Sequence, residues 1–265
     1  MKILIVGCGD IGTKVGCKLL KHSNEVHALK RTPSLDINNI FYIKADITDE
    51  KQTQKLDTDY DVVLFLATVD SRTKEAYLKL YDIGLNNILT HFSSKTSFIF
   101  ISSTVVYSEN KGEEVNEESV LLKDVNFRAD ILMVAEQRVI QHNEKSIVLR
   151  FSGIYGRGEK HMIEKLKKNI AIQQHPPYYT NRVHVDDCVN SILFIIEKSN
   201  KKRLDKSIYN VTQTKVLPLY DYACIVAKEN GLGVPLKDIL SEENTAQGKK
   251  ISNKSLLRLG YKFLH

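Results

Sequence analysis

The chain has 265 residues, 42% of them hydrophobic and 26% charged, so it can bury a full core and lies outside the compositions of disordered proteins. Its net charge of +6 is spread along the chain rather than gathered in one stripe, so we expect no nucleic-acid partner. No apolar stretch approaches the roughly 18 residues of a membrane-spanning helix, and we expect no membrane partner.

The cysteines indicate a reducing compartment. They show neither a C-x-x-C pair nor Cys/His ligand spacing, and a chain of this size does not need disulfide staples. The apolar run at residues 3–6 is far shorter than the core of a signal peptide. We therefore expect a cytoplasmic protein with reduced thiols at Cys8, Cys17, Cys188 and Cys224.

Short apolar runs alternate with longer amphipathic segments over the first two thirds of the chain. Continuous apolar runs are typical of parallel strands buried on both faces. They occupy residues 3–6, 26–29, 41–43, 62–67, 98–101 and 147–149. The segments 11–21, 74–92 and 129–140 carry apolar residues at helical spacing. This alternation predicts an α/β fold with a doubly wound parallel sheet.

The last third of the chain has a different character. Helix-like stretches at 162–170 and 189–198 are separated by Pro176 and Pro177, and short strand-like pieces follow. We predict a first domain over residues 1–155. A smaller C-terminal region is expected over residues 156–265, partly interleaved with the first.

A glycine-rich loop follows the first predicted strand and opens the first predicted helix. Residues 7–12 read Gly-Cys-Gly-Asp-Ile-Gly, the pattern G-x-G-x-x-G. The first glycine permits a tight turn, the second lets the backbone approach a pyrophosphate, and the third lets helix and strand pack closely. The pattern predicts a Rossmann dinucleotide-binding domain, in which Cys8 is a small loop residue rather than a nucleophile. The expected cofactor contacts are Gly7, Gly9, Asp10, Ile11 and Gly12.

The end of the second strand distinguishes NAD from NADP. An acidic residue there binds the ribose 2′-hydroxyl of NAD, whereas a basic residue accommodates the 2′-phosphate of NADP. The chain has Lys30 and Arg31 at that place, so we expect NADP rather than NAD, unless both are ordinary surface cations. Asp46, which ends the third strand, is expected either near the adenine or as a helix cap. Ala67 and Thr68 complete the expected cofactor contacts.

Four further segments carry a family resemblance. They are Phe-Ile-Phe-Ile-Ser-Ser-Thr-Val-Val-Tyr at 98–107, Leu-Arg-Phe-Ser-Gly-Ile-Tyr-Gly at 149–156, Arg-Val-His-Val-Asp-Asp at 182–187 and Tyr-Asn-Val at 209–211. With the glycine loop they resemble the extended branch of the short-chain dehydrogenase/reductase superfamily, the NAD-dependent epimerase/dehydratase family. Residues 250–261 are similar to the end of its shorter, atypical members. The resemblance implies a nicotinamide cofactor, a small-molecule substrate held by the C-terminal region, and an active site at the carboxyl ends of the strands.

The family's acid–base pair is missing. The family uses a Tyr followed four residues later by a Lys, because a phenol with a pKa of about 10 is a poor base near neutrality. Counting back from Glu136, which matches a family glutamate, places Arg128 and Leu132 at those two positions. One inserted residue places Phe127 and Ile131 there instead. Neither alignment restores the usual proton relay.

Three functions are compatible with this sequence. In the first, an NADP-dependent oxidoreductase of the atypical group acts on a small carbonyl or alcohol metabolite. Ser103 would orient the substrate oxygen, and Tyr155, Arg128 or the substrate itself would handle the proton. In the second, the fold binds the dinucleotide without chemistry, as a redox sensor or scaffold. In the third, the protein is a nucleotide-sugar epimerase or dehydratase, whose reaction also begins with hydride removal.

Two charged segments and the quaternary structure complete the expectations. His184, Asp186 and Asp187 do not by themselves form a closed ligand set, so we expect no metal there. The family resemblance implies that this segment is a structural link beside the substrate region. The acidic run at 113–118 is expected to be a solvated loop, or alternatively a lid. The helical segments at 74–92 and 129–140 could pack against a second copy, which would make a homodimer.

Overall fold

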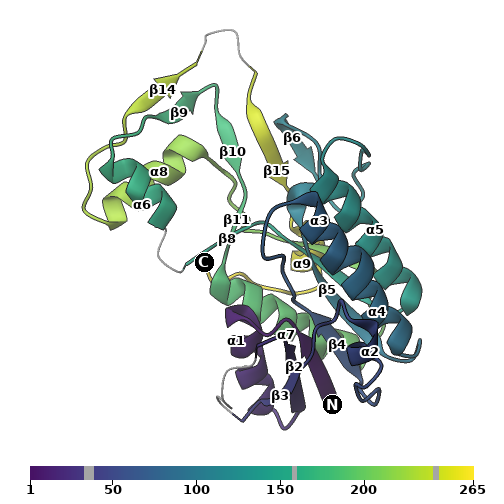
Figure 1. Ribbon diagram of the computed structural model, residues 1–265. Helices are drawn as coiled ribbons and strands as arrows, with labels where there is room; N and C mark the ends of the chain where they lie inside the picture. Colours follow the sequence, from purple (N-terminus) through teal and green to yellow (C-terminus); the bar gives the residue numbers. More distant parts are fainter. Residues whose placement is uncertain (33–38, 157–159, 241–244) are drawn as a thin grey trace. The chain divides into compact units, whose positions relative to one another are not determined.

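The computed structural model describes residues 1–32, 39–156, 160–240 and 245–265 (Figure 1). These residues form two compact units, each assembled from three separate stretches of chain. Unit 1 consists of Met1–Val106, Leu121–Arg150 and Val189–Tyr209. Unit 2 consists of Tyr107–Val120, Phe151–Cys188 and Asn210–His265.

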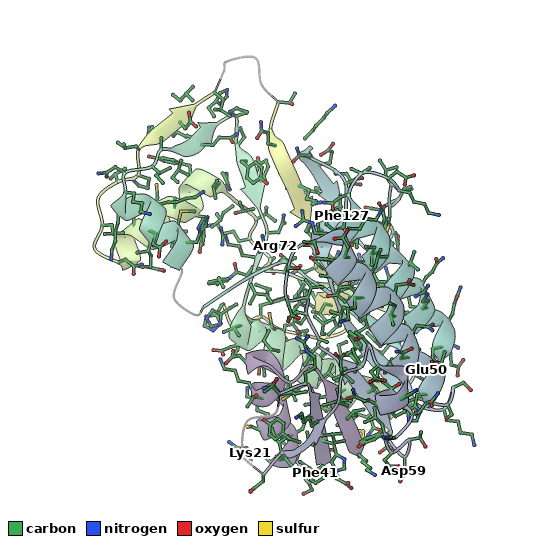
Figure 2. All side chains as sticks on the ribbon, viewed as in Figure 1. Lys21, Phe41, Glu50, Asp59, Arg72 and Phe127 are labelled. Carbon is green, nitrogen blue, oxygen red and sulfur yellow. The ribbon has the colours of Figure 1, made fainter. Side chains whose placement is uncertain are left out.

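A seven-stranded parallel sheet confirms the predicted doubly wound α/β fold. Its order is β12-β7-β5-β4-β1-β2-β3. The strands are β1 (Lys2–Val6), β2 (Glu25–Lys30), β3 (Phe41–Lys44), β4 (Val62–Phe65), β5 (Ser97–Ser103), β7 (Ile147–Phe151) and β12 (Ile208–Val211). The central strands β1 and β4 are fully buried at residues 3–6 and 62–65, which is why they read as continuous apolar runs. The edge strand β3 differs, and its Phe41 lies exposed at the surface (Figure 2).

Helices of unit 1 flank this sheet (Figure 1). Their bounds are α1 (Asp10–Leu20), α2 (Glu50–Thr53), α3 (Lys74–Tyr77), α4 (Leu85–His91), α5 (Phe127–His142) and most of α7 (Val185–Lys201). The single helix predicted over 74–92 is interrupted by one π-helical stretch, η1 (Leu78–Gly84), between α3 and α4. Gly84 ends that stretch where a Cβ atom would lie 2.9 Å from Ile47 Cγ1, so the close approach requires glycine.

Unit 2 is built from smaller sheets. A four-stranded sheet has the order β13-β10-β15-β6, and two strand pairs, β11-β8 and β14-β9, accompany it. The bounds are β6 (Lys111–Val115), β8 (Gly153–Tyr155), β9 (Ile172–His175), β10 (Tyr178–Thr180), β11 (Arg182–His184), β13 (Leu217–Pro218), β14 (Lys237–Ile239) and β15 (Gln247–Ile251). The helices are α6 (Lys160–Lys167), α8 (Leu219–Glu229) and α9 (Lys254–Arg258). Apolar side chains of α6, β9 and α8 form a core of this unit.

The acidic run at 113–118 is exposed at Glu113, Glu114 and Glu118, as the sequence predicts, but it is not a loop throughout. Its first part is strand β6, which pairs in parallel with β15, and Val115 lies buried opposite Ile251. Beyond the strand, Glu117 accepts the backbone N–H of Asn210 at 2.8 Å and the hydroxyl of Ser255 at 2.9 Å. The prediction of a loop was wrong for β6 because these partners lie far away in sequence, and only the folded unit brings them to the acidic run.

Two further findings concern the cysteines and the helices. None of the four cysteines, all of which lie in the described part of the chain, is in a disulfide. Of the helices that the structure describes, none is both long enough and apolar enough to span a membrane.

Candidate functional site

The glycine loop lies between β1 and α1, as predicted. Gly7 has φ +84°, and a Cβ atom there would lie 2.3 Å from the Cα of Ala67, which follows β4. A Cβ atom added at Gly12 would lie 3.3 Å from Ile5 Cγ2, so α1 and β1 approach each other closely at this glycine. Gly9 differs, because its Cβ position has no atom within 4 Å among the described residues. The loop is therefore tight at its first and third glycines and open at its second.

The N-terminal end of α1 has room for an anion. Gly9 precedes the helix, and within the described residues no side chain caps that end. The first N–H groups of a helix carry partial positive charge and favour a negatively charged ligand. Cys8 inside the loop is fully buried, and burial raises the pKa of its thiol, which agrees with a packing role rather than a nucleophilic one.

The two cations after β2 have different surroundings. Lys30 is the last residue of β2, where it lies opposite Lys44 of β3, and its carbonyl accepts the N–H of Ala45. Arg31 is exposed and donates from Nη2 to Asp70 Oδ1 at 2.7 Å. This pairing raises the pKa of the Arg31 guanidinium and lowers the pKa of Asp70. Asp70 was not among the predicted site residues, because nothing in the local sequence links it to the end of β2.

Asp46 is held in a turn by hydrogen bonds, whereas the side chain of Thr68 is exposed. The Asp46 carboxylate accepts the N–H of Thr48 at 2.9 Å and the Thr48 hydroxyl at 2.8 Å, so it stabilises a turn. The helix cap of α2 is a different residue, Asp49. Thr68 is exposed next to Ala67, at the same end of the sheet as the glycine loop.

Ser103 is the last residue of β5 and precedes the short 3-10 helix η2 (Thr104–Val106). Its Oγ accepts the N–H of Val105 at 3.2 Å, which orients the hydroxyl at the carboxyl end of the strand. Arg128 lies in the first turn of α5, whose N-cap Asn126 accepts the Arg128 backbone N–H at 3.0 Å. Ser103 and Arg128 both belong to unit 1.

The position of the missing Lys in α5 is apolar in either alignment, whereas the Tyr position holds Arg128 or Phe127. Leu132 is buried, and Phe127 packs its ring edge against Tyr77 with centroids 5.7 Å apart (Figure 2). One turn further, Glu136 forms a buried ion pair with Arg150, with Arg150 Nη2 2.6 Å from Glu136 Oε2. Ser102 donates to the same carboxylate at 2.5 Å. The family glutamate thus joins α5 to β5 and β7 and stabilises the fold.

Tyr155 belongs to unit 2, at the end of β8. Its hydroxyl accepts a hydrogen bond from Gln213 Nε2. Its ring meets the ring of His184 edge-on, with centroids 5.1 Å apart. Gln213 is a partner that the sequence did not point to, because it lies far along the chain.

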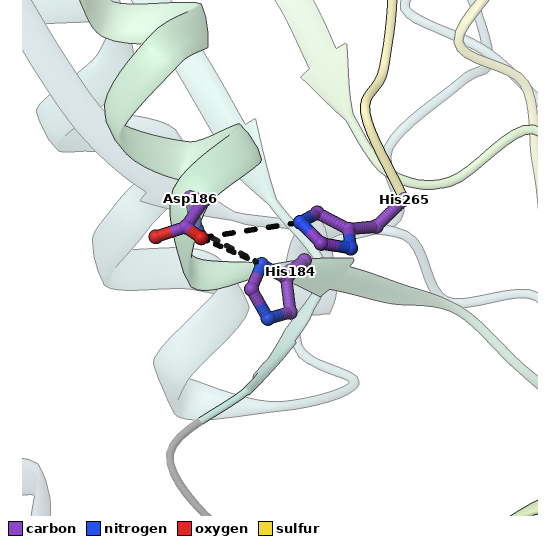
Figure 3. A group of neighbouring side chains, drawn as sticks. All are labelled: His184, Asp186 and His265. Atoms are coloured by element: carbon purple, nitrogen blue, oxygen red, sulfur yellow. Dashed lines mark hydrogen bonds and ion pairs between the residues drawn. The ribbon is translucent and has the colours of Figure 1, made fainter.

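The segment at 184–187 makes two separate sets of contacts in the structure. Asp187 is fully buried, and its carboxylate accepts the N–H of Leu264 at 2.8 Å and the N–H of His265 at 3.1 Å. It also accepts the hydroxyl of Tyr261 at 3.1 Å. Asp187 is therefore the expected structural link. His184 and Asp186 point instead to the imidazole of His265 (Figure 3).

Known structures with the same fold are numerous. The chain is 26% identical to a protein from Methylobacillus flagellatus provisionally described as an NAD-dependent epimerase/dehydratase, with a TM-score of 0.80 over 99% of this chain and 93% of that one. The UDP-glucuronic acid 4-epimerase of Bacillus cereus, solved in complex with NAD, has a TM-score of 0.79 at 20% identity, over 100% of this chain and 94% of that one. At that identity, the second likeness concerns the fold alone.

The sequence comparisons agree with the fold. A Caenorhabditis elegans protein named 3beta-hydroxysteroid dehydrogenase/Delta(5)-Delta(4) isomerase 1 is 30% identical over 144 residues, which are 49% of this chain and only 31% of that protein. The family model described as the RmlD substrate binding domain matches residues 1–259, almost the whole chain. The protein therefore belongs to the RmlD substrate binding domain family, within the extended short-chain dehydrogenases/reductases.

Proposed function

We propose that the protein binds a nicotinamide dinucleotide at its glycine loop and transfers a hydride to or from a carbonyl or alcohol carbon of a small metabolite. The observation that most strongly supports this proposal is the position of the glycine loop. It lies at the carboxyl end of β1, where the strand order reverses between β4 on one side and β2 on the other. Ligands of doubly wound sheets bind at this reversal. The open space at Gly9 and the uncapped end of α1 support a pyrophosphate there.

The preferred cofactor in this proposal is NADP. Lys30 ends β2 and Arg31 follows it, at the place where the adenosine ribose of a bound dinucleotide is held in this fold. A 2′-phosphate would compete with Asp70 for the Arg31 guanidinium, because one carboxylate already occupies it. Arg31 is exposed, so this exchange would require only side-chain rotation.

Substitutions at this ion pair are expected to shift cofactor preference in opposite directions. Arg31→Asp should weaken NADPH binding about tenfold or more while changing NADH binding little, because a charge-assisted contact to the 2′-phosphate is lost. Asp70→Asn should strengthen NADPH binding several-fold, because it removes the competing carboxylate. Fluorescence titration of each variant with both nucleotides measures the ratio. Equal losses for NADPH and NADH in Arg31→Asp would contradict the assignment.

The chemistry at the substrate needs an oriented oxygen and a proton. The Ser103 hydroxyl would donate a hydrogen bond to the substrate oxygen, because its Oγ already accepts a hydrogen bond from the Val105 N–H. Tyr155 is the proposed proton donor, and the Gln213 amide donates a hydrogen bond to its oxygen. Arg128 would bind a carboxylate or phosphate of the substrate. The nicotinamide supplies the hydride when the cofactor is bound.

The first experiment is a titration with NADPH and NADH, followed by addition of a panel of carbonyl metabolites to the loaded protein. Tight binding with loss of the reduced-nicotinamide absorbance supports the proposal and begins to name the substrate. Binding without consumption favours a sensor or scaffold. Absence of binding by either nucleotide contradicts the assignment of the glycine loop.

Ser103→Ala is expected to lower turnover about 100-fold or more while the affinity for the cofactor stays within twofold. The substitution removes one hydroxyl at the end of β5 and leaves the glycine loop untouched. Steady-state kinetics and nucleotide titration of the same preparation separate the two quantities. Unchanged turnover would show that another group orients the substrate.

A second candidate function is nucleotide-sugar epimerisation or dehydration. Its support is the likeness over nearly the whole chain to a protein described as an epimerase/dehydratase. In such a reaction the hydride removed from the substrate is returned to the intermediate in the same catalytic cycle, so there is no net consumption of the cofactor. Assaying nucleotide sugars by product analysis, in parallel with the absorbance assay, distinguishes this function from net oxidation or reduction.

A further inference from the structure

Three side chains of unit 2 bring metal-binding atoms together. His184 ends β11, Asp186 lies in the first turn of α7, and His265 arrives from the far end of the sequence (Figure 3). Their donor atoms all lie within 4.8 Å of one another. Asp186 Oδ2 is 3.6 Å from His184 Nδ1 and 3.9 Å from His265 Nε2. The two imidazole rings face each other with centroids 3.7 Å apart.

The arrangement is held by groups that are not themselves ligands. The buried carboxylate of Asp187 accepts the backbone N–H of His265 at 3.1 Å and so positions the last imidazole. On the other side, Gly156 leaves room for the His184 ring, because a Cβ atom there would lie 2.2 Å from Nε2. Contacts that fix the orientation of the metal-binding side chains are characteristic of metal sites.

The two separations from Asp186 are close to those that a metal requires. Zn–N and Zn–O bonds of about 2.0–2.2 Å in a tetrahedral site put neighbouring donor atoms about 3.4 Å apart. The two observed distances to Asp186 exceed this value by a few tenths of an ångström. The side chains of Asp186 and His265 are 51% and 42% exposed, so they can rotate to close the remaining gap.

The chemistry of the donors also favours a metal. His184 Nδ1 accepts the Asp186 backbone N–H at 3.2 Å, a long contact that a metal ion would replace in order to use the same lone pair. Two imidazoles and one carboxylate suit first-row divalent metals, Zn²⁺ among them. The imidazole rings of His184 and His265 are tilted by 36° with centroids 3.7 Å apart. Within this group of three residues, Asp186 supplies the one carboxylate that both imidazoles contact.

We propose that His184, Asp186 and His265 bind a divalent transition metal ion of the Zn²⁺ class, with water at the remaining positions. The sequence expectation of no metal considered Asp187 as the third residue, and the structure replaces it with His265. The ion would tie the C-terminal segment to the junction of β11 and α7, because its ligands come from both. All three residues lie within unit 2.

The test is titration of the apoprotein, freed of metal by a chelator, with Zn²⁺ by calorimetry and with Co²⁺ by absorption spectroscopy. We expect one ion per chain, visible Co²⁺ bands without a thiolate charge-transfer band, and a higher melting temperature with metal. Asp186→Asn and His265→Ala should each weaken binding about tenfold or more. Both residues are partly exposed, so the variants should fold, which the chelated melting temperature checks.

His22→Ala is the matched control, because His22 is an exposed histidine of unit 1 outside the cluster. It should bind metal as the unmodified protein does. The proposal is overturned if the unmodified protein binds neither ion saturably, if His265→Ala binds with unchanged affinity, or if a thiolate band places the ion on the cysteines.

Discussion

Gly9→Ala is expected to weaken dinucleotide binding about tenfold or more while leaving the melting temperature nearly unchanged. In the structure its Cβ would meet no described atom within 4 Å, and its φ of −83° suits alanine. The added methyl group would therefore be tolerated by the folded protein. It would, however, occupy the space into which a pyrophosphate must come to reach the N–H groups of α1.

Gly7→Ala is the contrasting variant. Gly7 has φ +84°, and its Cβ would lie 2.3 Å from the backbone of Ala67. We expect a loss of about 2–5 kcal/mol in the free energy of unfolding, from the left-handed backbone and the clash together. Thermal and urea denaturation measure that loss, and nucleotide titration measures affinity. Unchanged affinity in Gly9→Ala would show that the pyrophosphate does not approach this glycine.

Glu136→Ala is expected to cause the largest loss of stability among substitutions outside the glycine loop, about 3–5 kcal/mol. Both side chains of the Glu136–Arg150 pair are almost fully buried, at 4% and 3% exposure. Removing the carboxylate leaves the Arg150 guanidinium buried without its counter-charge, and Ser102 loses its acceptor. Urea denaturation measures the change in the free energy of unfolding.

Two companion variants separate charge burial from loss of packing. Ser102→Ala removes only one hydrogen bond to the carboxylate and should cost about 1–2 kcal/mol. The double variant Glu136→Leu with Arg150→Met removes both charges and should recover much of the stability lost in Glu136→Ala. If the double variant is as unstable as the single one, packing rather than the unpaired charge accounts for the loss.

The predicted elements that proved most accurate are those with local signals. The strands at 3–6 and 62–65 are buried on both faces, so every residue in them is apolar and the run is readable. The glycine loop is readable because its three glycines keep a fixed spacing between the first strand and the first helix. The absence of a Tyr/Lys pair in α5 was also evident, since it depends only on residue identity.

The partners of the candidate site were not readable in the same way. Asp70 pairs with Arg31 across 39 positions, Gln213 with Tyr155 across 58, and Asp187 with Leu264 across 77. None of these pairs has a periodicity or spacing that marks it. They exist because separate stretches of chain meet in the folded units.

The sequence by itself determined the parallel α/β sheet, the glycine loop at its first strand, the family, and the loss of the family's proton relay. Each of these depends on residue type at short range, where sterics and burial act on neighbouring positions. Only the tertiary structure decided that Asp70 pairs with Arg31, that Asp187 anchors the C-terminal segment, and that His265 joins His184 and Asp186. Such contacts arise from chain folding over long separations, which local sequence does not encode.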